Sequence, residues 1–145
     1  MREKDLSSEW LELAEMDLGA AKYLLGMRPV PVEIICYHCE QAAEKFLKGA
    51  LTLFQIEPPK THDLLQLCKM CCEVDERFAQ LVDACVELTP YGVQIRYPSN
   101  LELNETDMHI ALRECGMIRA FTQGIFQYSE PCGSPEPEEP APQLK

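Results

Sequence analysis

Apolar residues recur at steps of three and four between Glu33 and Phe54, which is the period of an amphipathic α-helix. The stretch contains no proline and is long enough to run through the centre of a small bundle. Polar residues border the apolar stripe, and Gln41, Lys45 and Lys48 share one helical face because they stand at i, i+4 and i+7. The pattern therefore predicts a central helix whose polar row is either a solvated flank or one wall of a site.

Apolar residues also recur at a helical period in the part of the chain before residue 28. Ser7 or Ser8 is expected to cap the first helix, and its inward side is expected to include Leu13 and, within the apolar stripe, Asp17. Two prolines in residues 28–31 end this helix. Because the link is so short, the central helix should run antiparallel to the first.

Three further helices are predicted downstream. One opens at Thr61-His62-Asp63 with Thr61 or Asp63 as its cap, another covers residues 76–88, and the last covers residues 105–126. Residues 89–98 contain proline, glycine and β-branched residues without a helical period, so a loop is expected there.

The chain as a whole is expected to be one all-α domain. Residues 1–128 should form an up-down bundle of about five helices, with a functional loop before the last one. Residues 129–145 read SEPCGSPEPEEPAPQLK. This segment is too rich in proline and glutamate to bury much apolar surface, and we expect a flexible tail.

The charge balance limits the classes of partner. The 145 residues carry a formal net charge of −11, from 13 basic and 24 acidic residues. An acidic chain is not expected to bind DNA or RNA in general, although it leaves room for a small basic pocket. No apolar run reaches the roughly 20 residues of a membrane span. The charged start, MREKDLSSEW, does not have the pattern of a signal peptide, so a cytoplasmic location is expected.

Eight cysteines require a separate explanation. Cys36 and Cys39 have CxxC spacing, and Cys68 with Cys71 repeats it. Both pairs lie within helical periods and lack the turn residues of a zinc knuckle. We therefore interpret the cysteines as thiols of the core or surface, and predict neither a metal site nor a cofactor.

The candidate binding residues come from separate segments. Arg96 offers a planar guanidinium that suits phosphate or carboxylate, and Tyr97 can stack on a base or donate its hydroxyl. The alternative is a loop arginine that bonds backbone carbonyls. His62 stands at a helix start, where anions are favoured, or is merely part of a capping segment. Lys45 is expected to pair with Asp17 on the adjacent helix, and Lys48 to lie on a solvated flank.

Four motifs lie between Glu9 and about Gln127. They are Trp10 with the four residues Ala14, Asp17, Leu18 and Ala21; YHCEQAAEKFLK at 37–48; PPKTHDL at 58–64; and LTPY at 88–91 with RYP at 96–98. Together these motifs resemble the HEPN domain family. The resemblance implies a helical bundle that is often a homodimer. It also implies a pairing with a minimal nucleotidyltransferase in a toxin–antitoxin-like system, and nucleotide binding as proposed for part of the family.

Many other HEPN proteins are metal-independent ribonucleases, which carry an arginine, four to six further residues and a histidine. This chain departs from that pattern because His109 follows Arg96 by thirteen residues. The first hypothesis is therefore a binding protein and not an enzyme. It would hold a nucleotide or similar anion among residues Arg96, Tyr97, His62, Lys45, Lys48, Gln41 and Asp17. The alternatives are a ribonuclease that uses His62 and Arg96 across a dimer cleft, and a purely structural dimerisation module.

Overall fold

The computed structural model describes residues 5–92 and 102–128. Within these ranges the chain forms five α-helices and two short 3₁₀ helices. They are α1 (Leu6–Leu24), α2 (Val32–Leu53), α3 (Leu64–Val74), η1 (Glu76–Leu81), α4 (Val82–Leu88), η2 (Thr89–Gly92) and α5 (Glu105–Tyr128). The expected all-α bundle is confirmed.

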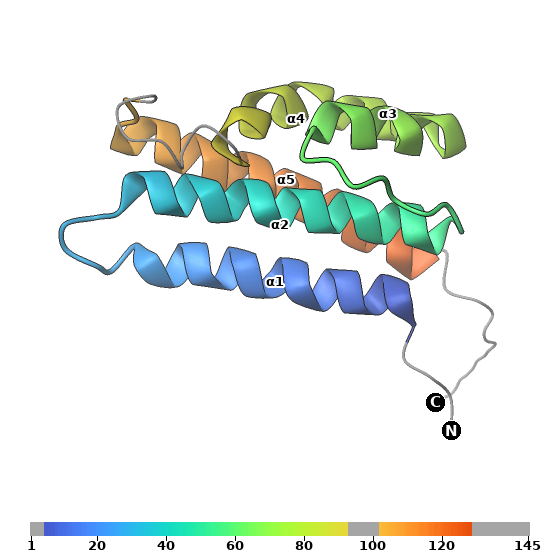
Figure 1. Cartoon of the computed structure of the whole chain (residues 1–145), viewed down its shortest axis with the longest axis horizontal. Helices are drawn as coiled ribbons and strands as arrows, with labels where there is room; N and C mark the ends of the chain where they lie inside the picture. Colours follow the sequence, from blue (N-terminus) through green and yellow to red (C-terminus); the bar gives the residue numbers. More distant parts are fainter. Residues whose placement is uncertain (1–4, 93–101, 129–145) are drawn as a thin grey trace, which may run out of the picture.

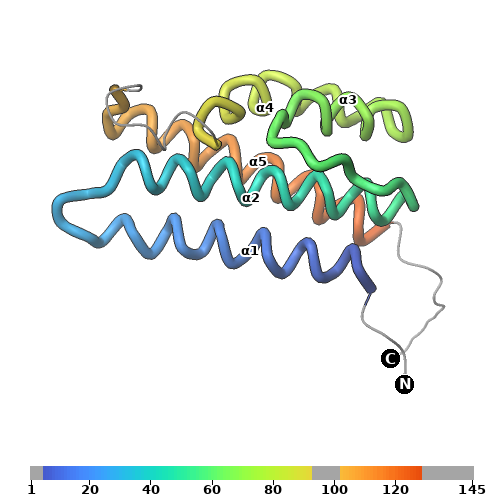
Figure 2. Tube along the Cα trace, in the orientation of Figure 1, coloured from blue at the N-terminus to red at the C-terminus, as the bar shows by residue number. Residues whose placement is uncertain are grey.

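The helices pack around α2. Helices α1 and α2 lie side by side and run antiparallel, as the short link between them requires, while α5 lies behind α2 (Figure 1). Helices α3 and α4 lie along the side of α2 that is away from α1 (Figure 2). A bridge joins α1 to α5, because the Glu15 carboxylate accepts from Arg119 Nε and Gln123 Nε2, each at 2.7 Å.

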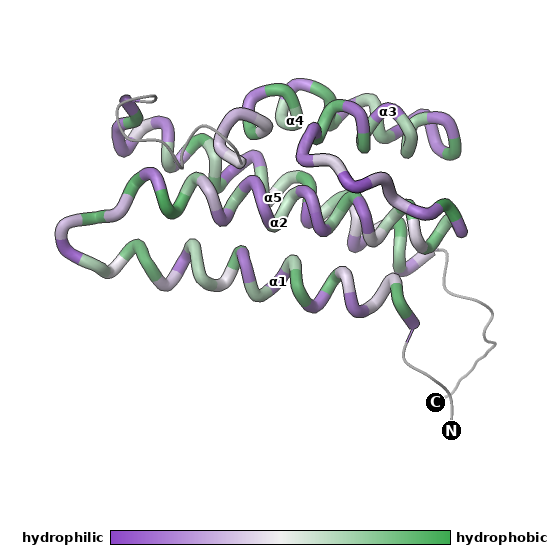
Figure 3. The backbone as a smooth tube through the Cα atoms, viewed as in Figure 1, coloured by the Kyte–Doolittle hydropathy of each residue, from purple (hydrophilic) through white to green (hydrophobic). Residues whose placement is uncertain are grey.

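The core follows from the position of α2. Of its 22 residues, 13 are buried, more than one helical face can supply, because neighbours cover it on several sides. The buried apolar side chains of α2 include Ile35, Phe46, Leu47 and Leu51, all fully inaccessible. Hydrophobic and hydrophilic residues alternate along every helix in Figure 3, as expected where each helix buries part of its surface.

Two details of the first helix differ from the sequence-based expectation. Asp5, and neither Ser7 nor Ser8, caps α1: its side chain accepts from the Ser7 backbone N–H at 3.3 Å, while Ser7 itself is buried. The helix thus begins before the expected cap. Leu13 was expected to face inward, yet it is 47% exposed, because α1 rests on α2 through the side that carries Ala14, Leu18 and Ala21.

From the start of α3 to Gly92 the chain forms more helical elements than expected. Asp63, one of the two expected caps, accepts from the backbone N–H groups of Leu65 and Gln66. The predicted helix over 76–88 is split into η1 and α4. Residues 89–92 of the expected loop form η2, and residues 93–98 lie outside the described residues.

The C-terminal end of α2 adopts a Schellman motif. The Ile56 N–H donates to the Leu51 carbonyl at 2.9 Å and the Gln55 N–H donates to the Thr52 carbonyl at 2.9 Å. This arrangement places Gln55 at φ 65°, in the left-handed region that usually favours glycine. The turn ends the central helix without a proline in it and directs the chain towards α3.

The cysteines are part of the core. Within the described residues, Cys72 is half-buried, and the others are buried: Cys36, Cys39, Cys68, Cys71, Cys85 and Cys115. The expectation of core thiols is confirmed for these residues. In the same part of the chain, no group of three or more His, Cys, Asp or Glu side chains could hold a metal ion. Nor is any helix there both long and apolar enough to cross a membrane.

Candidate functional site on helix α2

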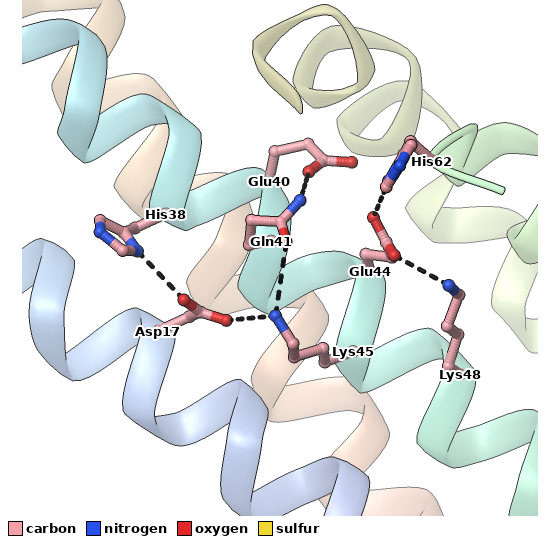
Figure 4. A network of polar contacts seen from close by, with 8 residues as sticks. All are labelled: Asp17, His38, Glu40, Gln41, Glu44, Lys45, Lys48 and His62. Carbon is pink, nitrogen blue, oxygen red and sulfur yellow. Dashed lines mark hydrogen bonds and ion pairs between the residues drawn. The ribbon is translucent and has the colours of Figure 1, made fainter. Parts of the chain in front are cut away.

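A first group of polar side chains joins α2 to α1. Lys45 Nζ donates to Asp17 Oδ2 at 2.6 Å, and His38 Nδ1 lies 3.0 Å from Asp17 Oδ1 (Figure 4). Lys45 also donates to Gln41 Oε1 at 3.4 Å. The Asp17 and Lys45 side chains are 18% and 22% exposed, so an acid within the apolar stripe of α1 is offset by a partner, as expected.

A second group lies one turn further along α2 and faces α3. Lys48 Nζ donates to Glu44 Oε2 at 2.8 Å, and His62 Nδ1 lies 3.0 Å from Glu44 Oε1 (Figure 4). Lys48 is only 8% exposed, and its ammonium stands 5.7 Å from the centre of the Trp10 ring. The expectation that Lys48 lies on a solvated flank was therefore wrong, because Trp10 of α1 covers this part of α2.

Glu40 lies between the two groups and is fully buried. Its Oε1 accepts from Gln41 Nε2 at 2.8 Å, whereas Oε2 has no hydrogen-bond partner among the described residues. Gly92 packs directly on this carboxyl: a Cβ added to Gly92 would stand 2.5 Å from Glu40 Cδ. Only a glycine can therefore occupy position 92 while Glu40 keeps its place.

The electrostatics of Glu40 follow from this burial. Loss of solvation, together with the nearby charge of Glu44, raises the pKa of Glu40 to about 8. At neutral pH this carboxyl is therefore largely protonated. The remaining charges of the two groups then balance, because Lys45 and Lys48 face the carboxylates of Asp17 and Glu44. A ligand anion would need a further cation.

The 3₁₀ helix η2 connects this region to the start of α3. Thr89 Oγ1 donates to the Cys85 carbonyl at 2.7 Å and accepts from the Leu64 N–H at 3.1 Å. One end of η2 is thus hydrogen-bonded to Leu64 at the start of α3, directly after Thr61-His62-Asp63. The other end, Gly92, contacts Glu40. The chain therefore enters residues 93–101 from a point beside the polar groups of α2.

The structure brings together most of the residues that the sequence singled out. Asp17, Gln41 and Lys45 belong to the first group, and Lys48 and His62 to the second. His62 is the most accessible member of the two ion-paired groups, with 53% of its side chain exposed. Arg96 and Tyr97, the other two candidates, lie outside the described residues.

Sequence reasoning did not select Glu40, Glu44 or Gly92 as site residues. A signal for the acids was present, since Glu40, Glu44 and Lys48 repeat at i, i+4 and i+8 and a Glu-to-Lys step of four favours an ion pair. Their burial, at 0% and 6% exposure for the two acids, depends on the helices that cover α2. No local pattern reveals that Gly92, 52 positions after Glu40 in the chain, packs on its carboxyl.

The fold and the paired polar groups define the class of the molecule, a helical bundle with a polar site along its central helix. Two solved structures share the fold. TT1696 from Thermus thermophilus superposes with a TM-score of 0.67 and 26% identity, covering 83% of this chain and 98% of that one. ST0689, an archaeal HEPN homologue, gives a TM-score of 0.66 and 23% identity, covering 86% of this chain and 98% of its own.

The family profile of the HEPN domain matches residues 7–125, so the chain belongs to the HEPN domain family. No curated protein matches the chain.

Proposed function

We propose that this HEPN protein binds a nucleotide or another small anion beside α2. The observation that carries the proposal is that Gly92, at the end of η2, packs on the carboxyl of Glu40, which lies between the two polar groups of α2 and accepts from Gln41. Arg96 follows Gly92 by four residues, a separation that an extended chain spans in at most about 14 Å. The permanently charged guanidinium of Arg96 can thus add the cation that the balanced pairs of α2 lack.

Each candidate has a distinct part in this proposal. Arg96 binds a phosphate in a fork, and Tyr97 stacks on the base or donates its hydroxyl. His62 is accessible and adds a hydrogen bond to the anion, while Glu44 orients its imidazole through Nδ1. The other candidates position one another: Lys45 donates hydrogen bonds to Asp17 and Gln41. Lys48 donates a hydrogen bond to Glu44 and so fixes the carboxylate that contacts His62.

Calorimetric titration of the full chain with ATP, GTP, AMP and inorganic phosphate tests the proposal. Binding should weaken at least about tenfold in Arg96→Ala, which loses a charge-assisted fork, and also in His62→Ala. Arg77→Ala is the matched control, since Arg77 is 61% exposed and pairs with Asp75. If a folded wild-type chain gives no heat of binding with any of the four compounds, the proposed ligand binding is refuted.

The second half of the proposal is a protein partner: a minimal nucleotidyltransferase encoded beside this chain. Co-expression of the two proteins, with a tag on this chain only, should recover the nucleotidyltransferase in a defined ratio. If the neighbouring reading frame encodes no such enzyme, or if the two proteins elute separately, the partnership is contradicted while the ligand site is unaffected.

One observation favours a second candidate function, a ribonuclease. The Glu44–His62 pair holds an accessible imidazole through Nδ1, an arrangement that general acid–base catalysis uses. Incubation with single-stranded RNA distinguishes the candidates. Cleavage that is lost in both His62→Ala and Arg96→Ala, and retained in Arg77→Ala, would support the ribonuclease; intact RNA with all variants would support the binding protein.

A further inference from the structure

Three cysteine thiols meet where α3 packs against α4. Cys68 and Cys72 stand four positions apart on α3, so their side chains are neighbours on one helical face. Cys85 belongs to α4, which lies against α3 (Figure 1). The Cys68 thiol is within hydrogen-bond reach of both other thiols, and it donates to the Phe78 carbonyl at 3.3 Å. Cys68 is therefore the central member of this thiol cluster of Cys68, Cys72 and Cys85.

The thiol cluster is accessible through one of its members. Cys72 is half-buried, whereas Cys68 and Cys85 are buried. The oxidation of a cysteine by a small molecule depends on the exposure of its sulfur, so Cys72 is the point of access. The adjacent Cys71 cannot take this part, because it is fully inaccessible and its thiol is directed at the Leu47 carbonyl of α2, 3.9 Å away.

The three thiols differ in how readily they lose a proton. A hydrogen bond from Cys85, assisted by one from Cys72, lowers the pKa of Cys68, although burial opposes the shift. The contact with Cys68, together with burial, raises the pKa of Cys85, and burial and the charge of Cys68 raise the pKa of Cys72. Within the cluster, Cys68 is therefore the thiol best suited to attack an oxidised neighbour.

We propose that the thiol cluster is a site of reversible oxidation by a peroxide, in which Cys72 is oxidised first and Cys68 then closes a disulfide. The Cys72 thiolate attacks the peroxide ROOH, the O–O bond breaks, and the products are a sulfenic acid on Cys72 and ROH, which carries the former thiol proton. The Cys68 thiolate attacks the Cys72 sulfur and releases hydroxide, which becomes water by taking the proton of Cys68. The two sulfur atoms lose the two electrons that the peroxide gains.

Cys85 allows the disulfide to move into the bundle. The Cβ atoms of residues four apart on a helix are roughly 5–6 Å apart, whereas a disulfide requires about 3.5–4.5 Å, so a Cys68–Cys72 bond requires α3 to distort locally. The Cys85 thiolate relieves this by attacking the Cys68 sulfur. The Cys68–Cys72 bond breaks, and Cys72 leaves as a thiolate that takes the proton of Cys85. The final Cys68–Cys85 disulfide joins α3 to α4.

Peptide mapping tests this proposal without any ligand, so its outcome is independent of nucleotide binding. The folded full chain, carrying Cys132→Ser to remove the cysteine outside the described residues, is treated with hydrogen peroxide, and free thiols are then blocked with N-ethylmaleimide. Trypsin places the three thiols on separate peptides, residues 61–69, 70–77 and 78–96. Mass spectrometry should find peptide 61–69 linked first to 70–77 and later to 78–96, and dithiothreitol should reverse both links.

Variants of the same chain identify the point of access. Cys72→Ser, and independently Cys72→Ala, should slow disulfide formation at least about tenfold, because peroxide then reaches Cys68 only when the helices open locally. Cys71→Ala is the matched control and should leave the rate unchanged. Cys39 and Cys115 provide a comparison within the chain: their thiols also contact one another, but both are fully buried and should stay reduced while the chain is folded. Circular dichroism establishes that each variant remains folded.

The outcomes separate the parts of the proposal. A folded chain whose thiol cluster stays reduced in peroxide would overturn it. So would Cys72 variants that are oxidised as fast as the parent chain, or a Cys39–Cys115 disulfide that forms at the same rate, since oxidation would then reflect general opening of the core. A disulfide that stays between Cys68 and Cys72 would overturn the transfer to Cys85.

Discussion

Asp17 and Lys45, separated by 28 positions in the chain, form an ion pair of 2.6 Å that joins α1 to α2. Both side chains are mostly shielded, at 18% and 22% exposure, and His38 shares the Asp17 carboxylate. A pair in such surroundings is screened less by water than a surface pair, and removing one partner leaves Asp17 with His38 alone or Lys45 with Gln41 alone.

We expect Lys45→Met to lower the free energy of unfolding by about 1–2 kcal/mol, and Asp17→Asn to lower it by a similar amount. The double variant should lose less than the sum, with a coupling energy of about 1 kcal/mol in a cycle measured by urea unfolding. The exposed Asp75–Arg77 pair provides the comparison, and its coupling is expected to be clearly smaller because water screens it. Equal coupling in both pairs would argue against a special role for the α1–α2 pair.

Gly92→Ala should destabilise the fold, because the new Cβ would stand 2.5 Å from Cδ of the fully buried Glu40 carboxyl. The expected loss is about 1–3 kcal/mol, typical of overpacking in a core. Glu40→Ala in the same chain should recover part of it by removing the opposing group. Chemical denaturation of the wild type, the two single variants and the double variant measures the free energy of unfolding of each. If the effects of the two substitutions simply add, Gly92 and Glu40 do not oppose one another.

The pH dependence of stability should reflect Glu40. Its pKa is raised from 4.5 to about 8, chiefly by burial, so the folded chain holds this proton more tightly than the unfolded chain does. The resulting stability is fully present below about pH 4.5 and is lost as the pH rises through about 8, with a total of up to about 5 kcal/mol.

Glu40→Gln should therefore flatten the free energy of unfolding between about pH 5 and pH 9, measured by urea unfolding at fixed ionic strength. Glu114, whose pKa burial and Glu87 also raise to about 8, contributes a slope of the same sign. The Glu114→Gln variant should remove that part alone, and the double variant should be the flattest. A slope that Glu40→Gln does not change would contradict the assignment to Glu40.

Gln55→Gly should stabilise the protein. Gln55 holds φ 65° in the Schellman turn, and a residue with a Cβ is strained there by roughly 1–2 kcal/mol. Glycine should gain about 0.5–1 kcal/mol net, after the greater entropy of the unfolded chain is subtracted. Gln55→Ala is the control, since alanine keeps the Cβ. Thermal unfolding should rank glycine above both glutamine and alanine; equal stability of the glycine and alanine variants would refute the strain.

Much of the fold could be predicted from local patterns. The period of apolar residues located α2 and the antiparallel α1, because helical spacing and a short proline link are local properties. The Asp17–Lys45 pair was also predictable, since an acid within an apolar stripe needs a cation from the neighbouring helix. The ends of the helices were less certain, as the cap at Asp5 and the split of residues 76–88 into η1 and α4 illustrate.

The amino-acid sequence by itself determined the helical period, the order of the helices and the supply of cations and acids along α2. Only the tertiary structure decided which of these groups are shielded: Lys48 is covered by Trp10, and Glu40 is closed in by Gly92. It also turned Leu13 outward. The physical reason is that a side chain's environment depends on surfaces contributed by residues far away in the chain, whereas helical periodicity depends only on its neighbours.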